Sequence, residues 1–242
     1  ASDFTVNNAT LSNFSGSGQN YTATLTPNSD NETCSISLNA DVFTDPNGNN
    51  NIASSTYTWT HDSVKPEITI SAKEVDSSGA AVNSGDTTNA ATLHMTFVST
   101  KATTNLVSSD FTLSGGSLSA LATSHDLTHT ATFTPAADQQ VSYTIGLDAG
   151  KYTDSLGNNN EAATQFAYTS DLLKPSMTIT AKKVNSDGAD LVSGQTTNDA
   201  TLHMILTASE VPTTDLLASD FTVNNATLSN FSGSGQNYTA TL

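Results

Sequence analysis

The chain repeats itself over long distances. Residues 1–25 read ASDFTVNNATLSNFSGSGQNYTATL, and residues 218–242 read the same letters. A diverged repeat has a spacing of 109 residues, because FTDPNGNNN at 43–51 returns as YTDSLGNNN at 152–160. Internal repeats decide an architecture before any local pattern does. We therefore predict an array of units of about 109 residues, in which two unit types alternate.

The composition excludes several classes of function. Charged residues make up 12% of the chain, with seven lysines, no arginine and a net charge of −16. Such a chain is repelled by phosphate backbones and by anionic lipid, so we expect no nucleic-acid partner. No apolar run reaches the roughly 18 residues that a membrane helix needs, so we expect no direct membrane insertion. The expected partners are neighbouring repeats of the same protein, metal cations, carbohydrate or another surface.

Short runs of alternating apolar and polar residues predict β-strands. Within 65–173, we expect strands at 67–72, 91–98, 110–113, 127–134, 141–147 and 162–169. In the second of these, Leu93, Met95 and Phe97 share one face, and threonines and His94 share the other. This pattern is typical of a half-solvated antiparallel sheet. Many short strands in a unit of about 100 residues predict an all-β fold made of tandem antiparallel β-sandwiches.

Proline marks the expected domain boundaries, in HDSVKP at 61–66 and in SDLLKP further on. Proline fixes φ and removes a hydrogen-bond donor, so it ends one sheet and stiffens the step into the next. We expect a partial domain at 1–64 (its C-terminal part), a complete domain at 65–173 and a partial domain at 174–242 (its N-terminal part). The two partial domains are complementary, so each is expected to expose unpaired sheet edges unless the next repeat or a neighbouring copy completes it.

The chain also resembles a known family. The segments PSMTITAKKV, LHMILTASEVPTTDLLASDFTVNNATLSNFSGSGQNYTATL and FTDPNGNNN are similar to the bacterial immunoglobulin-like (Ig-like) repeats of giant cell-surface adhesins. The resemblance implies Ig-like sandwiches in an extended extracellular stalk or filament at the cell surface, often stiffened by Ca²⁺ at domain junctions. The family's Ser-Glu pair is Ser209-Glu210 in one unit but Thr100-Lys101 in the other. Its Asp-x-x-Ala-Pro linker is Asp62-Ser63-Val64-Lys65-Pro66 here, which also adds a lysine.

Two Asp-x-x-Gly-Asn loops are candidate Ca²⁺ sites, since Ca²⁺ takes six to eight oxygen ligands from such side chains. The candidate ligands are Asp45, Asn47, Asn49, Asp62, Asp154, Asn158, Asp171 and Glu210. The alternative is a plain Asn-Gly hairpin turn, in which the glycine supplies a positive φ. A lysine ammonium opposes a divalent cation, so we expect calcium more readily beside Glu210 than beside Lys101.

For the cysteine and the aromatic residues, we expect structural roles. Cys34 lies on an alternating strand and is expected to be a core thiol. Trp59 and Tyr57 precede the linker and are expected to pack in a core or junction, with a sugar-stacking platform as the alternative. His125 and His129 are four residues apart, which is ligand spacing on a helix but not on a strand. The chain contains no nucleophile elbow, phosphate loop or dinucleotide motif, so we expect no enzyme.

Two hypotheses of function remain. The first is a structural tandem-repeat segment of a large extracellular surface protein, acting as a spacer or assembly element. The alternative is a repeat unit that itself binds carbohydrate or ice through threonine-rich strand faces. An exposed aromatic cluster, or a threonine array unbroken by charge, would favour the second. A hydrolase would need a cleft of convergent carboxylates.

Overall fold

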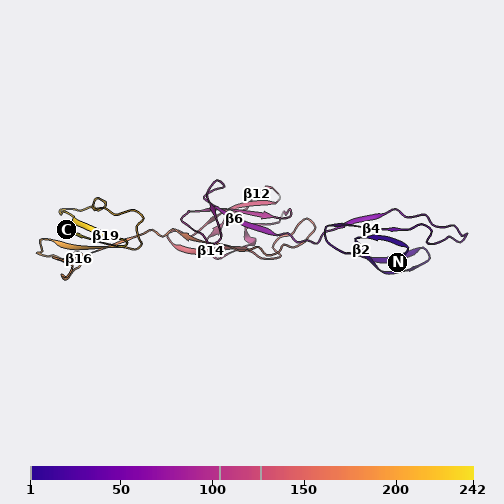
Figure 1. The fold of residues 1–242 in the computed structure, drawn as a ribbon, viewed down its shortest axis with the longest axis horizontal. Helices are drawn as coiled ribbons and strands as arrows, with labels where there is room; N and C mark the ends of the chain where they lie inside the picture. Colours follow the sequence, from indigo (N-terminus) through magenta and orange to yellow (C-terminus); the bar gives the residue numbers. More distant parts are fainter. Residues whose placement is uncertain (1, 104, 126) are drawn as a thin grey trace. The chain divides into compact units, whose positions relative to one another are not determined.

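The computed structural model describes residues 2–103, 105–125 and 127–242. The chain forms two compact units, residues 1–171 and 172–242, and each is described by itself. Both units are built from β-strands, several of which are labelled in Figure 1, with two short 3₁₀ turns in the described residues. The predicted all-β class is confirmed.

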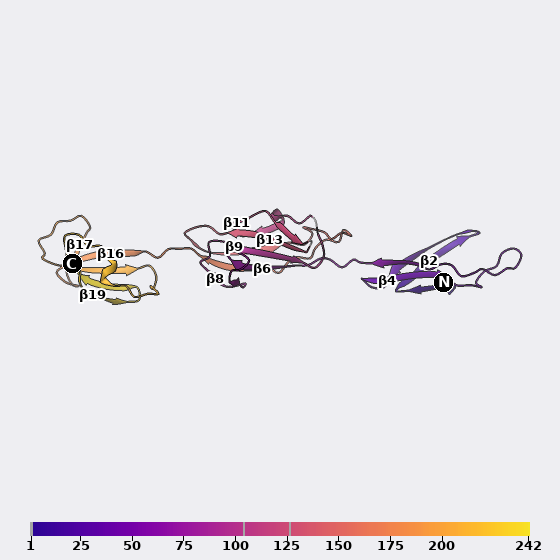
Figure 2. The ribbon, with the colours of Figure 1, turned by 90° about the horizontal axis from the view of Figure 1, so that it is seen from above.

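Residues 65–171 form a sandwich of two sheets. The first sheet has the order β11-β13-β9-β6-β7, with β12 also paired to β13, and Figure 2 labels several of these strands. The second has the order β10-β14-β15-β8. The strands of the first sheet are β6 (Ile68–Glu74), β7 (Ala81–Val82), β9 (Leu93–Ser99), β11 (Ser117–Leu118), β12 (Ala122–His125) and β13 (Thr128–Thr134). Those of the second are β8 (Thr87–Thr88), β10 (Phe111–Leu113), which follows the turn η1 (Ser108–Asp110), β14 (Gln140–Leu147) and β15 (Phe166–Asp171).

The core of this sandwich lies between the two sheets. Leu93, Met95 and Phe97 are fully buried, as their alternation predicts. The ring of Phe97 packs at 4.2 Å from that of Phe111, in the opposite sheet. Phe133 makes similar ring contacts to two tyrosines of the second sheet. Aromatic contacts of this kind add to the burial of apolar area, and they hold the two sheets face to face.

All six strands expected within 65–173 are present, shifted by a few residues at their ends. The alternation did not predict β7, β8, β11 or β12, because the first three have only two residues each and β12, with the sequence ATSH, does not alternate apolar and polar residues. One pairing departs from the antiparallel pattern, since β8 runs parallel to β15 with Thr87 opposite Thr169. The other strand pairings described for this sandwich are antiparallel.

Residues 1–64 form a sheet and a hairpin. The sheet has the order β1-β4-β5, and β2 pairs with β3 in the hairpin. These strands are β1 (Phe4–Asn7), β2 (Ala9–Ser17), β3 (Asn20–Pro27), β4 (Glu32–Leu38) and β5 (Tyr57–His61). Cys34 is fully buried, which confirms the core thiol. Trp59 is half-buried, but Tyr57 is 67% exposed, so the expected packing is wrong for Tyr57.

Residues 172–242 form one five-stranded sheet with the order β17-β16-β18-β20-β19. The strands are β16 (Met177–Lys183), β17 (Asp190–Leu191), β18 (Leu202–Ala208), β19 (Ser229–Ser234) and β20 (Asn237–Thr241), with the turn η2 (Ala218–Asp220) before β19. Leu206, Tyr238 and Ala240 form its small buried core. The boundaries expected at 65 and 174 stay predictions.

Candidate functional site at the Asp62–Pro66 linker

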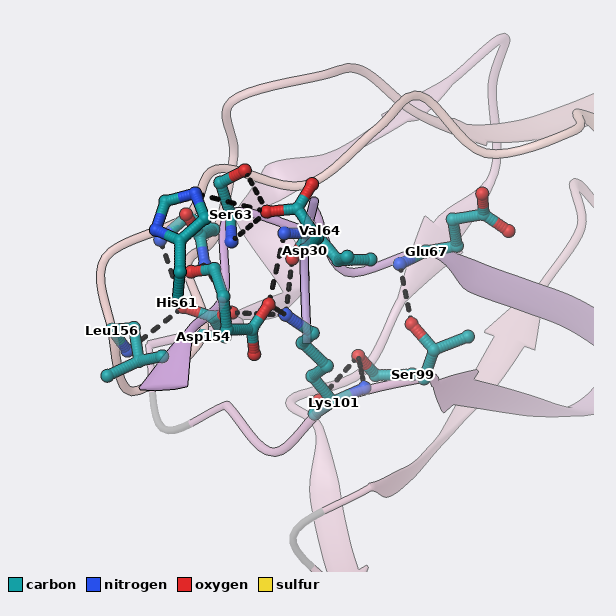
Figure 3. A network of polar contacts seen from close by, with 12 residues as sticks. Asp30, His61, Ser63, Val64, Glu67, Ser99, Lys101, Asp154 and Leu156 are labelled. Atoms are coloured by element: carbon teal, nitrogen blue, oxygen red, sulfur yellow. Dashed lines mark hydrogen bonds and ion pairs between the residues drawn. The ribbon is translucent and has the colours of Figure 1, made fainter. Parts of the chain in front are cut away.

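Lys101 lies in the loop after β9, and its ammonium reaches the linker between β5 and β6 (Figure 3). Its Nζ is 2.7 Å from Oδ1 of Asp62 and 3.1 Å from Oδ2 of Asp154. It also donates to the carbonyl oxygen of Val64. One ammonium thus binds three oxygens from two segments that lie far apart in the sequence.

The loop at 152–160 presents Asp154 to that ammonium. Oδ1 of Asp154 accepts the backbone N–H groups of Leu156, at 3.0 Å, and Asn158, at 2.9 Å. The side-chain amide of Asn158 donates to Oδ2 of Asp154 at 3.0 Å and to the carbonyl of Asp62 at 3.2 Å. The hydrogen bond from the Asn158 side chain, supported by backbone N–H groups and Lys101, holds the pKa of Asp154 well below its usual range. Asp154 is therefore a carboxylate at any ordinary pH.

Backbone contacts hold Lys101 in place. The hydroxyl of Ser99 donates to the carbonyl of Lys101 at 2.7 Å, and it lies 3.0 Å from the hydroxyl of Tyr152. Thr100 N–H donates to the carbonyl of Glu67 at 2.9 Å. Burial of the Lys101 side chain opposes its charge, but hydrogen bonds and the charges of Asp62 and Asp154 outweigh this and raise the pKa of Lys101. The lysine stays a cation.

The rest of the linker is also engaged. Asp30 accepts both the backbone N–H and the hydroxyl of Ser63, and these bonds lower the pKa of Asp30. Lys65 pairs with Glu161 at 2.8 Å, with both side chains half exposed. The N–H of Glu161 donates to the carbonyl of Pro66 at 2.9 Å. Asp30 and Glu161 belong to no spaced motif, so the sequence alone does not identify them.

Comparison with known protein families shows which family these units belong to. Residues 1–60 and 62–170 match the family model described as the bacterial Ig-like domain. The chain belongs to the bacterial Ig-like domain family. No match was found among curated proteins or among solved structures. Bacterial Ig-like domains are typically non-catalytic and often surface-exposed. No helix in the described part of the chain is long and apolar enough to cross a membrane.

The first candidate Ca²⁺ loop of this Ig-like protein closes on itself. Oδ1 of Asp45 accepts the N–H groups of Asn47 and Asn49, at 2.9 and 2.8 Å. The side-chain amide of Asn49 donates to Oδ2 of Asp45 at 2.9 Å. Gly48 has φ +85°, as the turn requires. Asp45 holds the turn together with both of its oxygens, which is the geometry of the plain-turn alternative.

The other candidate ligands fall into two groups. Asp62, Asp154 and Asn158 come together, but around the Lys101 ammonium. Asp171 ends β15 and accepts from Nε2 of Gln140 at 3.1 Å, and Glu210 is exposed in the other unit. No group of three or more His, Cys, Asp or Glu side chains is placed to hold a metal within the described ranges. The residues around Asp62 do not fit a Ca²⁺ site, because the Lys101 ammonium already supplies a positive charge among these oxygens.

Glu210 takes the backbone position that Lys101 has in the preceding unit. Ser209 N–H donates to the carbonyl of Ser176 at 2.8 Å, as Thr100 does to Glu67. Ser176 N–H donates in turn to Oγ of Ser209 at 2.9 Å, as Glu67 does to Thr100. The two unit types therefore place opposite charges at one structural position.

Proposed function

We propose that the chain is a structural, non-catalytic spacer segment of an extracellular bacterial surface protein, such as an adhesin stalk or filament. Its main partners are neighbouring repeats of the same protein. The main support for the proposal is the network of contacts that the linker at 62–66 makes. Each of the five linker residues contacts one of the two parts that the linker joins: Asp62 and Val64 bind Lys101, Ser63 binds Asp30, and Lys65 and Pro66 bind Glu161.

A linker held at every residue restricts the angle between the parts it joins. A flexible linker is instead rich in Gly and Ser and makes few contacts. The charge of −16 adds self-repulsion, which favours an extended array over a collapsed one. The engaged linker and the negative charge favour a spacer, which separates other parts of a protein, over a binding module, which presents a binding site.

We propose a calcium site only beside Glu210. At the Asp62 linker, Lys101 supplies a permanent positive charge. In the alternate unit, Glu210 removes that charge and adds a carboxylate at the same position. A divalent cation neutralises such carboxylates, since Ca²⁺ prefers anionic oxygen ligands. We propose that the two kinds of junction alternate between a lysine and a calcium ion.

The surface gives the binding alternative little support. On the outward face of β6, β9 and β13, Thr96 lies opposite Thr130, but the next row pairs His94 with Lys73 and Thr132. The threonine array is thus interrupted by charge. Tyr57, which is 67% exposed, and the half-buried Trp59 form an aromatic pair with ring centres 6.1 Å apart. The equivalent pair in the complete sandwich has the same spacing and is buried, which marks these as core positions.

Small-angle X-ray scattering on a protein with four units in tandem tests the spacer function. We expect the profile of a rod, because the Asp62–Pro66 linker is engaged at every residue and the chains repel themselves. Screening of that repulsion by added salt should change the rod little. A profile of a compact globule, or of freely jointed beads, would refute the proposal.

A further inference from the structure

His129 is a buried histidine that takes no part in the linker network. It lies on the core face of β13, in line with Ala131 and Phe133, and is 3% exposed. Its Nδ1 is 3.0 Å from Oγ1 of Thr123, on the edge strand β12. Its Nε2 is buried and has no hydrogen-bond partner among the described residues. A neutral imidazole has one donor and one acceptor nitrogen, so one polar ring atom is unsatisfied in either tautomer.

The other unit type carries a tyrosine at this position. His129 lies opposite Phe97 of β9, and Tyr238 lies opposite Leu206 of β18. Phe97 and Leu206 are themselves 109 residues apart, which is the spacing of the repeat. Tyr238 is buried as well, at 5% exposed. One core position of the Ig-like domain thus holds a histidine in one unit and a tyrosine in the other.

The residue on the neighbouring edge strand changes together with it. Tyr238 lies opposite Gly233, where a Cβ would come within 2.8 Å of Cδ1 of the tyrosine ring. His129 lies opposite Thr123, which shares a hydrogen bond with the imidazole. The glycine leaves space for a large ring, whereas the threonine gives a polar partner to a smaller one. The pair of Thr123 and His129 therefore replaces ring packing by a hydrogen bond.

The closed sandwich opposes a positive charge on His129. The protonated ring has two N–H donors, and Nε2 has no described acceptor. Burial also disfavours the charged form, and it lowers the pKa of His129 below that of an exposed histidine. A ring that reaches water binds its proton at about pH 6.5. A state that exposes the ring therefore gains on the closed state as the pH falls below about 6.5.

The neighbouring strands of the first sheet bring no charge to this ring within the described residues. The residues directly opposite His129, which are Phe97 on β9 and Thr123 on β12, are uncharged. His94 is the titratable residue of β9, and it lies on the outward face opposite Thr132. Strand β11 contains no titratable residue. The burial of the imidazole is therefore not offset by a carboxylate on these strands.

The second sheet has no carboxylate facing this core position in its described strands. Strand β10 contains no titratable residue. Tyr143 of β14 and Tyr168 of β15 both have their rings against Phe133, further along β13. Two titratable residues lie near in sequence, His125 at the end of β12 and Asp126, which is outside the described residues. An experiment must separate these two from the buried histidine.

Strand β12, labelled in Figure 1, is the element whose movement would expose His129. It has four residues and pairs with β13 alone. Its register shifts between Thr123 and His125, which interrupts the ladder. Thr123 is itself exposed to solvent. Short edge segments with few contacts are the parts of a fold that open locally at the lowest free energy.

We propose that Thr123 and His129 form an acid-sensitive latch, which holds the edge strand β12 on β13 at neutral pH and releases it in acid. In the open state, the imidazole is protonated and reaches water, and β12 leaves β13. The freed edge of β13 is then a template for a further strand. The unit with Tyr238 has no histidine at this position, so it stays closed. Two unit types that alternate along an array would thus differ in their response to acid.

Amide hydrogen exchange of the full chain, followed by NMR on either side of about pH 6.5, tests the latch. After correction for the intrinsic exchange rate, the protection of the amides that bond β12 to β13 should fall by up to about tenfold for each pH unit below about 6.5. Amides between β14 and β15 should keep their protection. His129→Gln should remove the pH dependence, because glutamine does not titrate. The double variant Thr123→Gly with His129→Tyr reproduces the pair of the other unit and should be equally insensitive.

His125→Gln, Asp126→Asn and His94→Gln are the matched controls, and each should keep the pH dependence of the wild type. Loss of that dependence in a control would assign the titration to another residue and overturn the inference. So would equal pH dependence in the wild type and the two His129 variants. Equal loss of protection in both sheets would mean that acid unfolds the whole sandwich, which also contradicts a latch. The outcome does not depend on the spacer function, which the scattering experiment tests separately.

Discussion

Replacing Ile145 by alanine is expected to destabilise the complete sandwich by about 2–5 kcal/mol, the usual cost of deleting a fully buried isoleucine side chain. Ile145 is completely buried on β14, between the two sheets. The equivalent residue on β4 is Ile36, which is only partly buried. Ile36→Ala should therefore cost about 1 kcal/mol or less in dilute solution. The same chemical change at equivalent positions is thus expected to lower the free energy of unfolding by two very different amounts.

Chemical denaturation followed by two signals measures this difference. Far-UV circular dichroism reports on all sheets, and Trp59 fluorescence reports on residues 1–64. Ile145→Ala should shift the transition that Trp59 does not report, and Ile36→Ala should leave both nearly unchanged. Equal costs in dilute solution would show that sheet β1-β4-β5 already has a cover within one chain.

Replacing Lys101 by glutamate is expected to make the Asp62 junction depend on calcium. The substitution places a third carboxylate beside Asp62 and Asp154, which already lie within 3.1 Å of the lysine Nζ. Without calcium, mutual repulsion should destabilise the fold. A ligand at about 100 times its Kd contributes roughly 2.7 kcal/mol, which corresponds to a rise in Tm of about 10 °C or more for a domain of this size.

Calorimetry with and without chelator measures the gain, and Lys101→Met is the matched control. Methionine removes the ammonium without adding a carboxylate, so this variant should lose stability with little recovery in calcium. The wild-type junction should not respond to calcium, because Lys101 Nζ binds the same oxygens. If Lys101→Glu and Lys101→Met respond equally to calcium, the ammonium does not stand where a metal ion would bind.

The sequence predicted the elements that a period of two can reveal. The alternation in 91–98 placed Leu93, Met95 and Phe97 in the core, and all three are fully buried. It did not reveal the short edge strands or the parallel pairing of β8 with β15, because two residues carry no period. Tyr57 has a core sequence pattern and yet is exposed. The local sequence pattern indicates which face of a strand is apolar. Whether that face is buried depends on contacts with residues far away in the sequence.

The candidate site was predicted in part. The family pattern identified Lys101 as a departure near the cation ligands Asp62 and Asp154, and the structure places its ammonium on both. The contact between Asp30 and Ser63 joins residues 33 positions apart and follows no motif. The calcium assignment of Asp171 and Glu210 stays a prediction. Spacing indicates which oxygens are near one turn, but it does not show which cation they hold.

We expect Lys101 to fix the Asp62–Pro66 linker without a metal ion. Spin labels at two exposed strand positions, Thr58→Cys on β5 and Thr132→Cys on β13, measure it by electron double resonance, in a Cys34→Ala background. We predict one narrow distance distribution, unchanged between chelator and calcium, and a broad distribution in the Lys101→Met variant. A wild-type distribution that is broad in chelator and narrows only with calcium would show that calcium, and not Lys101, fixes the linker.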